Sequence, residues 1–204
     1  MSHSVKREGS SEPNDELLFV GDHAAIDFIN TMHIVDGVLT DTLRSDNDVR
    51  RWLARSGLSH AACSATWAEG ELLRAARRLR EIAVHGMQCR KAKKKFPLTE
   101  LNDFLSKAVS YSQLVTESLR LKVKRSYLAR TPEEFLAPVA EAVADLLANA
   151  DFDLVRQCAG EKCVLWFYDH TKSHHRRFCS AAVCGNRAKV AAYRARQRST
   201  CRPR

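Results

Sequence analysis

With 204 residues, of which 45% are hydrophobic and 28% charged, the chain has the composition of a globular protein, which excludes a fibrous or largely disordered one. Its formal net charge of +9 favours a polyanionic partner. No apolar run approaches the roughly 20 residues of a membrane span, and the polar first residues lack the apolar segment of a secretory signal, so we expect a cytoplasmic protein without a membrane span.

The first predicted elements are a leader, a short helix and a hairpin. Residues 1–16 are rich in Ser, Glu and Asp and show no hydrophobic period, which predicts a disordered leader. An apolar run over 17–20 follows, and one or two helical turns are expected around 24–31. Asp36-Gly37 between apolar residues is a hairpin signal, because both residue types tolerate the left-handed backbone of a two-residue turn.

Three helices are predicted next. A Ser-x-x-Asp pattern with a later glycine indicates a short helix over 45–57. The longest predicted helix starts at Thr66, which opens a Thr-x-x-Glu capping box, and Gly86 is expected to end it. The basic residues 90–95 then form a linker, and Thr99 is expected to cap the third helix.

After the third predicted helix, the hydrophobic residues recur at every second position. Leu119, Leu121 and Val123 alternate with basic residues, which predicts a half-exposed strand paired with residues 113–116. A second strong helix is expected from Thr131, which is followed by proline at the first helical position and by a glutamate placed to close a capping box.

The excess positive charge lies near the end of the chain. From Arg156 to Arg204 there are 12 lysines and arginines and two acidic residues, whereas the preceding part has 21 basic and 22 acidic residues. This distribution predicts a tail that contacts a polyanion such as nucleic acid, with a merely solvated basic tail as the alternative.

Four of the seven cysteines form a pattern: Cys158, Cys163, Cys179 and Cys184 are spaced C-x4-C, fifteen residues, C-x4-C. Thiols stay reduced in the cytoplasm, so this pattern favours a metal site over disulfides. Four thiolates in a tetrahedron suit zinc, and such a site has no open position for catalysis. We therefore predict one structural Zn²⁺ per chain and, since no nucleophile has an evident base, no enzyme activity.

Two alternatives to this ligand set remain open. Buried cysteines can act as small apolar residues, which is how we interpret Cys63, Cys89 and Cys201, cysteines without a partner at zinc spacing. Histidines of the intervening loop, which we interpret as loop or phosphate-facing residues, could also replace one cysteine: His170, His174 and His175.

Taken together, these patterns predict an α+β fold. Residues 17–150 are expected to form a mostly helical N-terminal domain with small β-hairpins, for sensing or dimerisation. Residues 151–204 are expected to form a small treble-clef or ribbon-like zinc module followed by a basic C-terminal helix. A module of this size has little core of its own, so metal binding would supply much of its stability.

Two motifs resemble a known family. The sequence Cys-Gly-Asn-Arg at 184–187, preceded by Arg-Phe-Cys-Ser at 177–180, resembles the CGNR zinc finger of bacterial transcription regulators. Those proteins carry an N-terminal domain called ABATE, and the segment Ala-Ile-Asp-Phe-Ile-Asn-Thr at 25–31 resembles its Leu-Asp-Phe-Val-Asn-Thr signature. Gly21-Asp22 stands where a pair of glycines is usual. The resemblance implies a zinc-containing, stress-responsive regulator that binds DNA.

The predicted partner is therefore duplex promoter DNA, and a homodimer is the default expectation for a regulator that meets two half-sites. The residues expected to contact nucleic acid are Arg176, Arg177, Asn186, Arg187, Lys189, Arg194, Arg196 and Arg198. The basic side chains would contact phosphates, while Asn186 or one arginine would read a base edge. For Asn186 and Arg187 the alternative is that they cap the zinc loop and fix it to the body.

Asp27, Asn30 and Thr31 place polar groups on an otherwise apolar segment, which predicts a site for a small-molecule effector. The alternative is that these short side chains cap the helix and stabilise the following turn.

Two further functions remain as alternatives. An RNA-binding zinc ribbon could stack unpaired bases on Phe167, Tyr168 and Phe178. A redox sensor could lose its metal when the zinc thiolates are oxidised.

Overall fold

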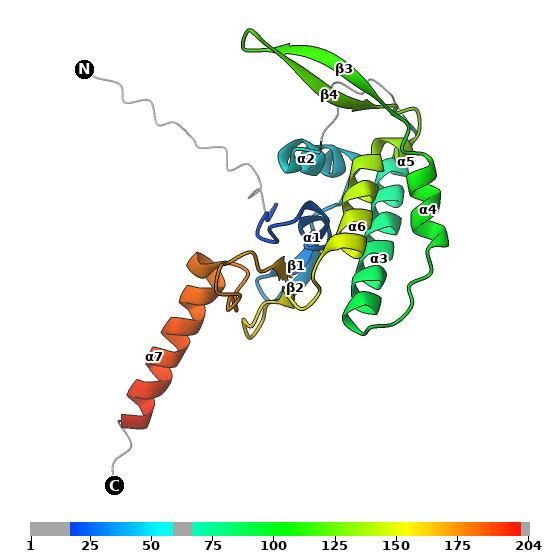
Figure 1. Cartoon of the computed structure of the whole chain (residues 1–204). Helices are drawn as coiled ribbons and strands as arrows, with labels where there is room; N and C mark the ends of the chain where they lie inside the picture. The colour runs from blue at the N-terminus through cyan, green and yellow to red at the C-terminus, as the bar shows by residue number, and fades with distance from the viewer. Residues whose placement is uncertain (1–16, 59–66, 201–204) are drawn as a thin grey trace, which may run out of the picture.

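The computed structural model describes residues 17–58 and 67–200. The predicted leader and the predicted cap at Thr66 lie outside these ranges. Figure 1 shows a helical body, a long hairpin at one end and a final helix that points away from the body. In chain order the elements are α1 (Ala24–Ile29), β1 (Met32–Val35), β2 (Val38–Asp41), α2 (Asp46–Ser56), α3 (Glu71–Lys91), α4 (Thr99–Ser106), β3 (Ser110–Glu117), β4 (Arg120–Tyr127), α5 (Pro132–Phe135), α6 (Ala137–Asn149), β5 (Val155–Gln157), β6 (Trp166–Tyr168), the π-helical turn η1 (Ala181–Gly185) and α7 (Asn186–Thr200).

The body is packed around the short helix α1, whose sequence Ala-Ala-Ile-Asp-Phe-Ile is apolar nearly all round, as expected for an enclosed helix. Ile26 and Phe28 are fully buried. Helices α3 and α6 contact α1, while α2 packs on α3 and α4 on α6. Trp52 of α2 closes this core against Phe28, with the two ring centroids 5.1 Å apart. The expected mixed fold, mostly helical with small antiparallel hairpins, is confirmed.

Two local predictions near the N-terminus are confirmed. Strands β1 and β2 form a hairpin whose turn residues, Asp36 and Gly37, have φ of 49° and 86°. Both values are left-handed, which is why the Asp-Gly pair suits this turn. Helix α2 is capped by Ser45, whose hydroxyl accepts from the Asp48 N–H, and it ends at Gly57 in the left-handed conformation.

The prediction that Gly86 ends the long helix is wrong. Helix α3 continues to Lys91, so part of the expected basic linker is helical. A Cβ atom at Gly86 would lie 2.7 Å from Leu147 Cδ1 of α6 and 3.3 Å from the Phe96 ring. The glycine therefore permits a close approach of α6 and the following loop to α3, and tertiary packing overrides its weak helix propensity.

Two helix starts also differ from expectation. Thr99 is the first residue of α4 rather than its cap, and no side chain caps that helix. The Thr131 cap is confirmed, with its Oγ1 accepting from the Glu134 N–H at 3.2 Å. The helix it begins is not continuous, because the helix is interrupted at Leu136, between α5 and α6. Pro138 has no N–H for the Glu134 carbonyl, which accounts for the break.

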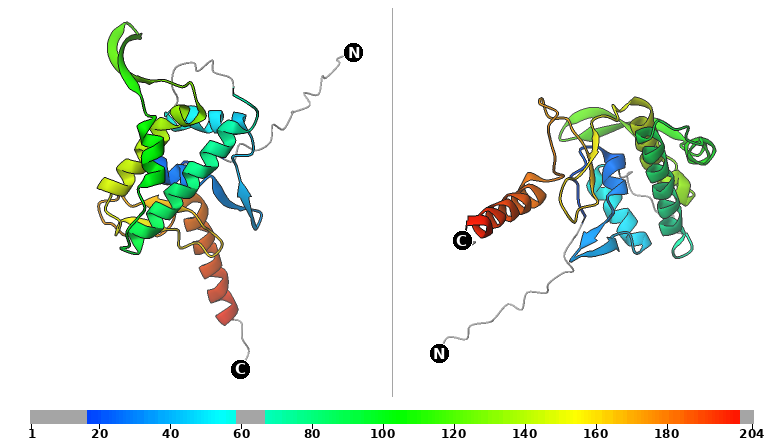
Figure 2. Two further views of the ribbon diagram at one scale, coloured as in Figure 1. Left: turned by 90° about the vertical axis from the view of Figure 1, so that its right-hand side faces the viewer. Right: turned by 90° about the horizontal axis from the view of Figure 1, so that it is seen from below.

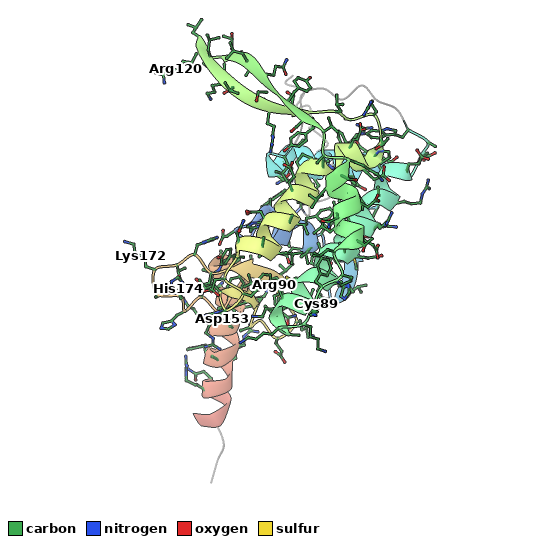
Figure 3. The ribbon with its side chains drawn as sticks, turned by 45° about the vertical axis from the view of Figure 1, so that its right-hand side comes forward. Cys89, Arg90, Arg120, Asp153, Lys172 and His174 are labelled. Carbon is green, nitrogen blue, oxygen red and sulfur yellow. The ribbon has the colours of Figure 1, made fainter. Side chains whose placement is uncertain are left out.

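The pairing of β3 with β4 is confirmed, but the expectation of a half-buried sheet is not. Leu114 pairs with Val123, and Leu121 lies beside them on the same face of the hairpin. Their exposures are 63%, 73% and 69%. The hairpin extends away from the helices, with Arg120 labelled at its far end (Figure 3), so its alternation does not correspond to a covered face. Among the described helices, none is long and apolar enough to cross a membrane.

Candidate metal centre

The first pair of cysteines is carried by the β5–β6 hairpin. Cys158 directly follows β5, and its N–H extends the strand pairing by donating to the Leu165 carbonyl at 2.8 Å. The chain then turns so that the Cys163 N–H donates to the Gly160 carbonyl at 3.0 Å. A Cβ atom at Gly160 would approach Cys163 Cβ to 3.2 Å and Cys184 Sγ to 3.4 Å, so a glycine there leaves room for the sulfurs.

The second pair lies on the turn that leads into α7. Cys179 precedes η1 and Cys184 is within it, and both are buried. Ser180 holds this turn, since its Oγ accepts from the Val183 N–H at 3.3 Å and its carbonyl accepts from the Gly185 N–H at 2.9 Å. One pair thus lies on a hairpin and the other at the start of a helix, as expected for a small four-cysteine module followed by a C-terminal helix, and Figure 2 shows α7 leaving from this point.

The four sulfur atoms have the spacing of a tetrahedral metal site. All four lie within 4.8 Å of one another, with 3.7 Å between the sulfurs of Cys163 and Cys179 and 3.6 Å between those of Cys179 and Cys184. Four sulfurs about 2.3 Å from a central ion are about 3.8 Å apart, whereas a disulfide requires about 2.05 Å. The geometry therefore fits one metal ion held by four cysteines.

The electrostatics of the cluster also favour a cation. Burial and the neighbouring sulfurs raise the pKa of the Cys179 thiol, and burial raises that of Cys163 to about 11. Burial acts in the same direction on Cys158, but N–H groups of Cys179 and Gly160 donate to its sulfur at 3.3 and 3.4 Å, and its net pKa shift is downward. Four thiolates this close repel one another, and a bound divalent cation would offset that repulsion.

The loop between β6 and Cys179 is organised by a buried carboxylate. Asp169 accepts from the Thr171 Oγ1 at 2.6 Å and from the Arg176 N–H at 2.9 Å. Burial opposes ionisation of Asp169, but these donors outweigh it and lower its pKa. The loop histidines are exposed and are not among the residues grouped around the sulfurs, and Figure 3 shows His174 and Lys172 at the margin of the module.

Most of the residues predicted to contact nucleic acid are exposed on or near α7. Arg177 precedes Cys179, and the side chain of Arg198 lies outside the part that the structure describes. Helical periodicity places Arg187 and Arg194 on one face of α7, and Lys189 and Arg196 on the opposite face. The exposed residues are Arg177, Asn186, Arg187, Lys189, Arg194 and Arg196. The helix therefore carries positive charge around much of its surface, and α7 projects away from the body (Figures 1 and 2).

Arg176 differs from these residues because its guanidinium is engaged within the protein. Its Nη2 donates to the Val20 carbonyl at 2.9 Å and to the Cys179 carbonyl at 2.5 Å, and its Nε donates to the Phe178 carbonyl at 3.0 Å. The guanidinium also lies 4.4 Å from the centre of the Phe167 ring. This internal role competes with the phosphate contact predicted for Arg176.

The remaining N–H donors of Arg176 face Asp22, with which Nη1 forms an ion pair. Asp22 has φ of 56°, in the left-handed region that favours glycine. This is the position where the sequence departs from a usual pair of glycines, and here the aspartate offsets its backbone strain with a contact to Arg176.

The polar residues predicted to face an effector have partners inside the protein. Asn30 bridges the body and the hairpin, because its Nδ2 donates to the Trp166 carbonyl at 2.8 Å and its Oδ1 accepts from the Trp166 N–H at 2.9 Å. Thr31 donates to the Phe28 carbonyl at 2.7 Å and accepts from Arg80 at 2.8 Å. Asp27 accepts from the Gly21 N–H at 2.8 Å. These contacts give structural roles to all three, and Asn30 also lines a hollow in the surface.

Sequence reasoning missed the segment that joins the two cores. Leu17 and Phe19 pack against the core of the body, whereas Leu18 and Val20 pack against the cysteine cluster. The Gly21 carbonyl then accepts from the Tyr168 N–H at 2.8 Å. The signal was present in the apolar run 17–20, since an extended chain directs successive side chains to opposite sides.

The pKa of Asp27 leads to a testable pH dependence. Burial raises this pKa to about 6, more than the hydrogen bond from Gly21 lowers it. The value in the unfolded chain is about 3.9, so the folded state binds the proton more tightly. This contribution to stability is complete below about pH 4 and is lost as the pH rises through about 6.

We therefore expect wild-type protein to lose about 1 kcal/mol more stability than Asp27→Asn between pH 5 and pH 7.5. Asparagine keeps an oxygen acceptor for Gly21 but does not titrate. Urea unfolding of both proteins at the two pH values measures the difference, with Asp36→Asn in the exposed hairpin turn as the matched control. Parallel pH profiles for wild type and Asp27→Asn would contradict this prediction.

Comparisons with known proteins agree with this architecture. The model of the ABATE domain, described as "Putative stress-induced transcription regulator", matches residues 22–150. The model of the CGNR zinc finger matches residues 155–197 and thereby includes all four cysteines of the cluster. A search of the curated proteins finds no match.

Proposed function

Because the chain belongs to the ABATE family and ends in a CGNR zinc finger, we propose that it is a DNA-binding transcription regulator whose four cysteines hold one structural zinc ion. The sulfur spacing supports zinc, which has no geometric preference of its own and accepts a tetrahedral set of four thiolates. Such a site leaves no coordination position for a substrate. We therefore assign the zinc site to folding and the exposed basic surface to binding, with no catalytic step.

The observation that carries the DNA-binding proposal is the basic helix anchored at the metal centre. Cys184 and Arg187 are three residues apart, so the turn that holds the ion also fixes the direction in which α7 leaves the module. The major groove is about 12 Å wide and admits one α-helix. With basic side chains on two opposite faces, α7 can contact phosphates on both sides of a groove while Asn186 or an arginine meets base edges.

Recognition of unpaired RNA bases has less support from the aromatic side chains. Phe167 is fully buried beneath Arg176, and Phe178 packs in the cysteine cluster. Tyr168 is partly buried with its ring centroid 4.1 Å from that of His170. These three rings offer little surface for stacking, which single-strand binding generally uses, and the exposed aromatic side chain of α7 is Tyr193. Duplex DNA read by phosphate contacts is therefore the better match, and a homodimer on paired half-sites completes the proposal.

The test is electrophoretic mobility of the zinc-loaded chain on its own upstream DNA over a salt series. We expect sequence-selective binding that weakens steeply with salt, and the double variant Arg187→Ala/Arg194→Ala is expected to reduce the slope of log K against log[salt] by about two. The matched control is Arg120→Ala/Lys122→Ala, which removes two exposed basic residues from the β3–β4 hairpin. Equal effects of the two double variants, or a preference for single-stranded competitor, would overturn the proposal.

A further inference from the structure

A hollow of about 830 Å³ lies where the helical body meets the zinc-finger hairpin. Its walls come from three places: the end of α1 with the β1–β2 hairpin, one face of α3, and residues on and next to β5 and β6. The volume is within the range of about 300 to 1,000 Å³ that small-molecule sites occupy. The hollow is therefore large enough for one drug-sized molecule that touches both parts of the chain.

Helix α3 presents a regular face to this hollow. Glu81, Val84, His85 and Gln88 line it at positions i, i+3, i+4 and i+7, which follow one side of a helix. Val84 is partly buried, and the three polar residues are exposed. This wall therefore places polar groups at the rim beside an apolar floor.

The floor and the opposite walls are mainly apolar. Met32 and Leu39 come from the β1–β2 hairpin, Met87 from α3, and Val164 and Trp166 from the zinc finger. Methionine side chains are flexible and polarisable, and indole offers a large flat surface, so these residues suit an aromatic body of adaptable shape.

One lining carboxylate, that of Glu81, is exposed at the rim of the hollow and offers a contact for a cation. Arg80 also lines it, but its guanidinium is compensated by Asp41, with Nη1···Oδ1 2.7 Å and Nη2···Oδ2 2.6 Å. Glu81, by contrast, has no ion-pair partner among the described residues. Arg77 shares Asp41 with Arg80, its Nε lying 3.1 Å from Asp41 Oδ2, so the exposed charged group of the lining without a described ion pair is the Glu81 carboxylate.

From this arrangement we infer that the hollow is the effector site and that it binds a small aromatic molecule carrying a protonated amine. The aromatic body lies against Met32, Leu39 and Trp166, and the ammonium group faces Glu81. The backbone of Trp166 is held by Asn30, so an occupant contacts the hairpin that positions the zinc ligands. The assignment as an effector site rests on the proposed function; the binding itself does not.

The experiment uses three dansyl probes with one fluorophore and different charges, titrated into the zinc-loaded full chain without DNA. Dansylcadaverine carries an ammonium group, dansylamide is neutral and dansylglycine is anionic. We expect saturable, blue-shifted emission with dansylcadaverine, at an affinity about fivefold higher than for dansylamide and higher still relative to dansylglycine, as one partly exposed ion pair allows.

Two variants, each with a matched control, locate the site. Leu39→Lys removes an exposed apolar wall and adds positive charge, and it is expected to weaken dansylcadaverine binding by about tenfold. Leu114→Lys makes the same change on the exposed β3–β4 hairpin and is expected to have no effect. Glu81→Gln is expected to bring dansylcadaverine and dansylamide to equal affinity. Glu69 is an exposed glutamate that does not line the hollow, so Glu69→Gln is expected to keep the difference in affinity between the two dyes.

Dansylcadaverine binding that is absent, or that Leu39→Lys and Leu114→Lys weaken equally, would overturn the site. Binding at the hollow with no preference for the cation would overturn the ligand class. Because no DNA is present in the dye titration, absence of dye binding leaves the DNA-binding proposal intact. Conversely, a failed mobility shift overturns DNA binding without changing the result of the dye titration.

Discussion

Replacing Cys179 by serine is expected to release the metal and unfold the C-terminal module while the helical body stays folded. Three of the five buried residues in the core of this module are cysteines of the metal cluster, and the other two are Leu165 and Phe167. So small a core cannot replace the metal contribution, which is about 10 to 16 kcal/mol in zinc-finger peptides. The body has its own core around Phe28 and Trp52, so it does not depend on the ion.

Three measurements check this expectation. Metal analysis should give about one zinc per wild-type chain and none for Cys179→Ser. Limited proteolysis should cleave the variant within residues 155–200 while a fragment of the body survives, and the mobility shift on DNA should disappear. Cys89→Ser is the matched control, because Cys89 is also buried but lies in α3 outside the cluster. A Cys179→Ser protein that keeps its zinc and its protease resistance would refute the assignment of the metal site.

Substitutions of the neighbouring residues Arg176 and Arg177 are expected to affect different properties. Arg176→Ala should lower stability, whereas Arg177→Ala should weaken DNA binding. Arg176→Ala leaves the carbonyls of Val20, Phe178 and Cys179 without their charged donor, and it breaks the ion pair with Asp22. We expect it to lower the free energy of unfolding by about 3 kcal/mol. The substitution would weaken the junction, by which we mean the contact between the N-terminal part and the zinc finger. Val20 and Asp22 belong to the N-terminal part and Arg176 to the zinc finger.

Arg177→Ala removes an exposed side chain whose only described contact is with the Phe178 ring, 5.7 Å away. We expect it to change stability by less than about 0.5 kcal/mol and to weaken DNA binding with a smaller salt slope. Urea unfolding and the mobility shift, measured on the same preparations, give both quantities. The distinction between structural and phosphate-contacting arginines would fail if Arg177→Ala were as destabilising as Arg176→Ala.

The junction explains why the polar residues of the segment 25–31 are placed as they are. Asn30 holds the zinc-finger hairpin through the backbone of Trp166, and Asp27 holds the Gly21 turn that pairs with Tyr168. A molecule in the adjacent hollow touches Asn30 and Trp166 together. Because a ligand that binds one arrangement better than another stabilises that arrangement, occupancy of the hollow would be linked to the docking of the zinc finger.

The sequence by itself determined the features that depend on local chemistry. The spacing of the four cysteines identified the residues that the fold brings together, because the ligands of such a metal site occur in pairs at characteristic spacings in the sequence. The Asp36-Gly37 turn, the caps of α2 and α5, and the pairing of β3 with β4 followed from backbone preferences that act over a few residues. The positive charge of the α7 region likewise followed from the number of lysines and arginines in the sequence.

Only the tertiary structure decided what depends on distant neighbours. Gly86 remains helical because Leu147 of α6 packs against it, which no pattern around residue 86 reveals. Arg176 and Arg177 are identical in type and adjacent, yet one is enclosed by Val20, Asp22 and Phe167 and the other faces solvent. The partners of Arg176 in the N-terminal part are more than 150 residues away in the chain, and contacts over such separations are set by packing rather than by local preference.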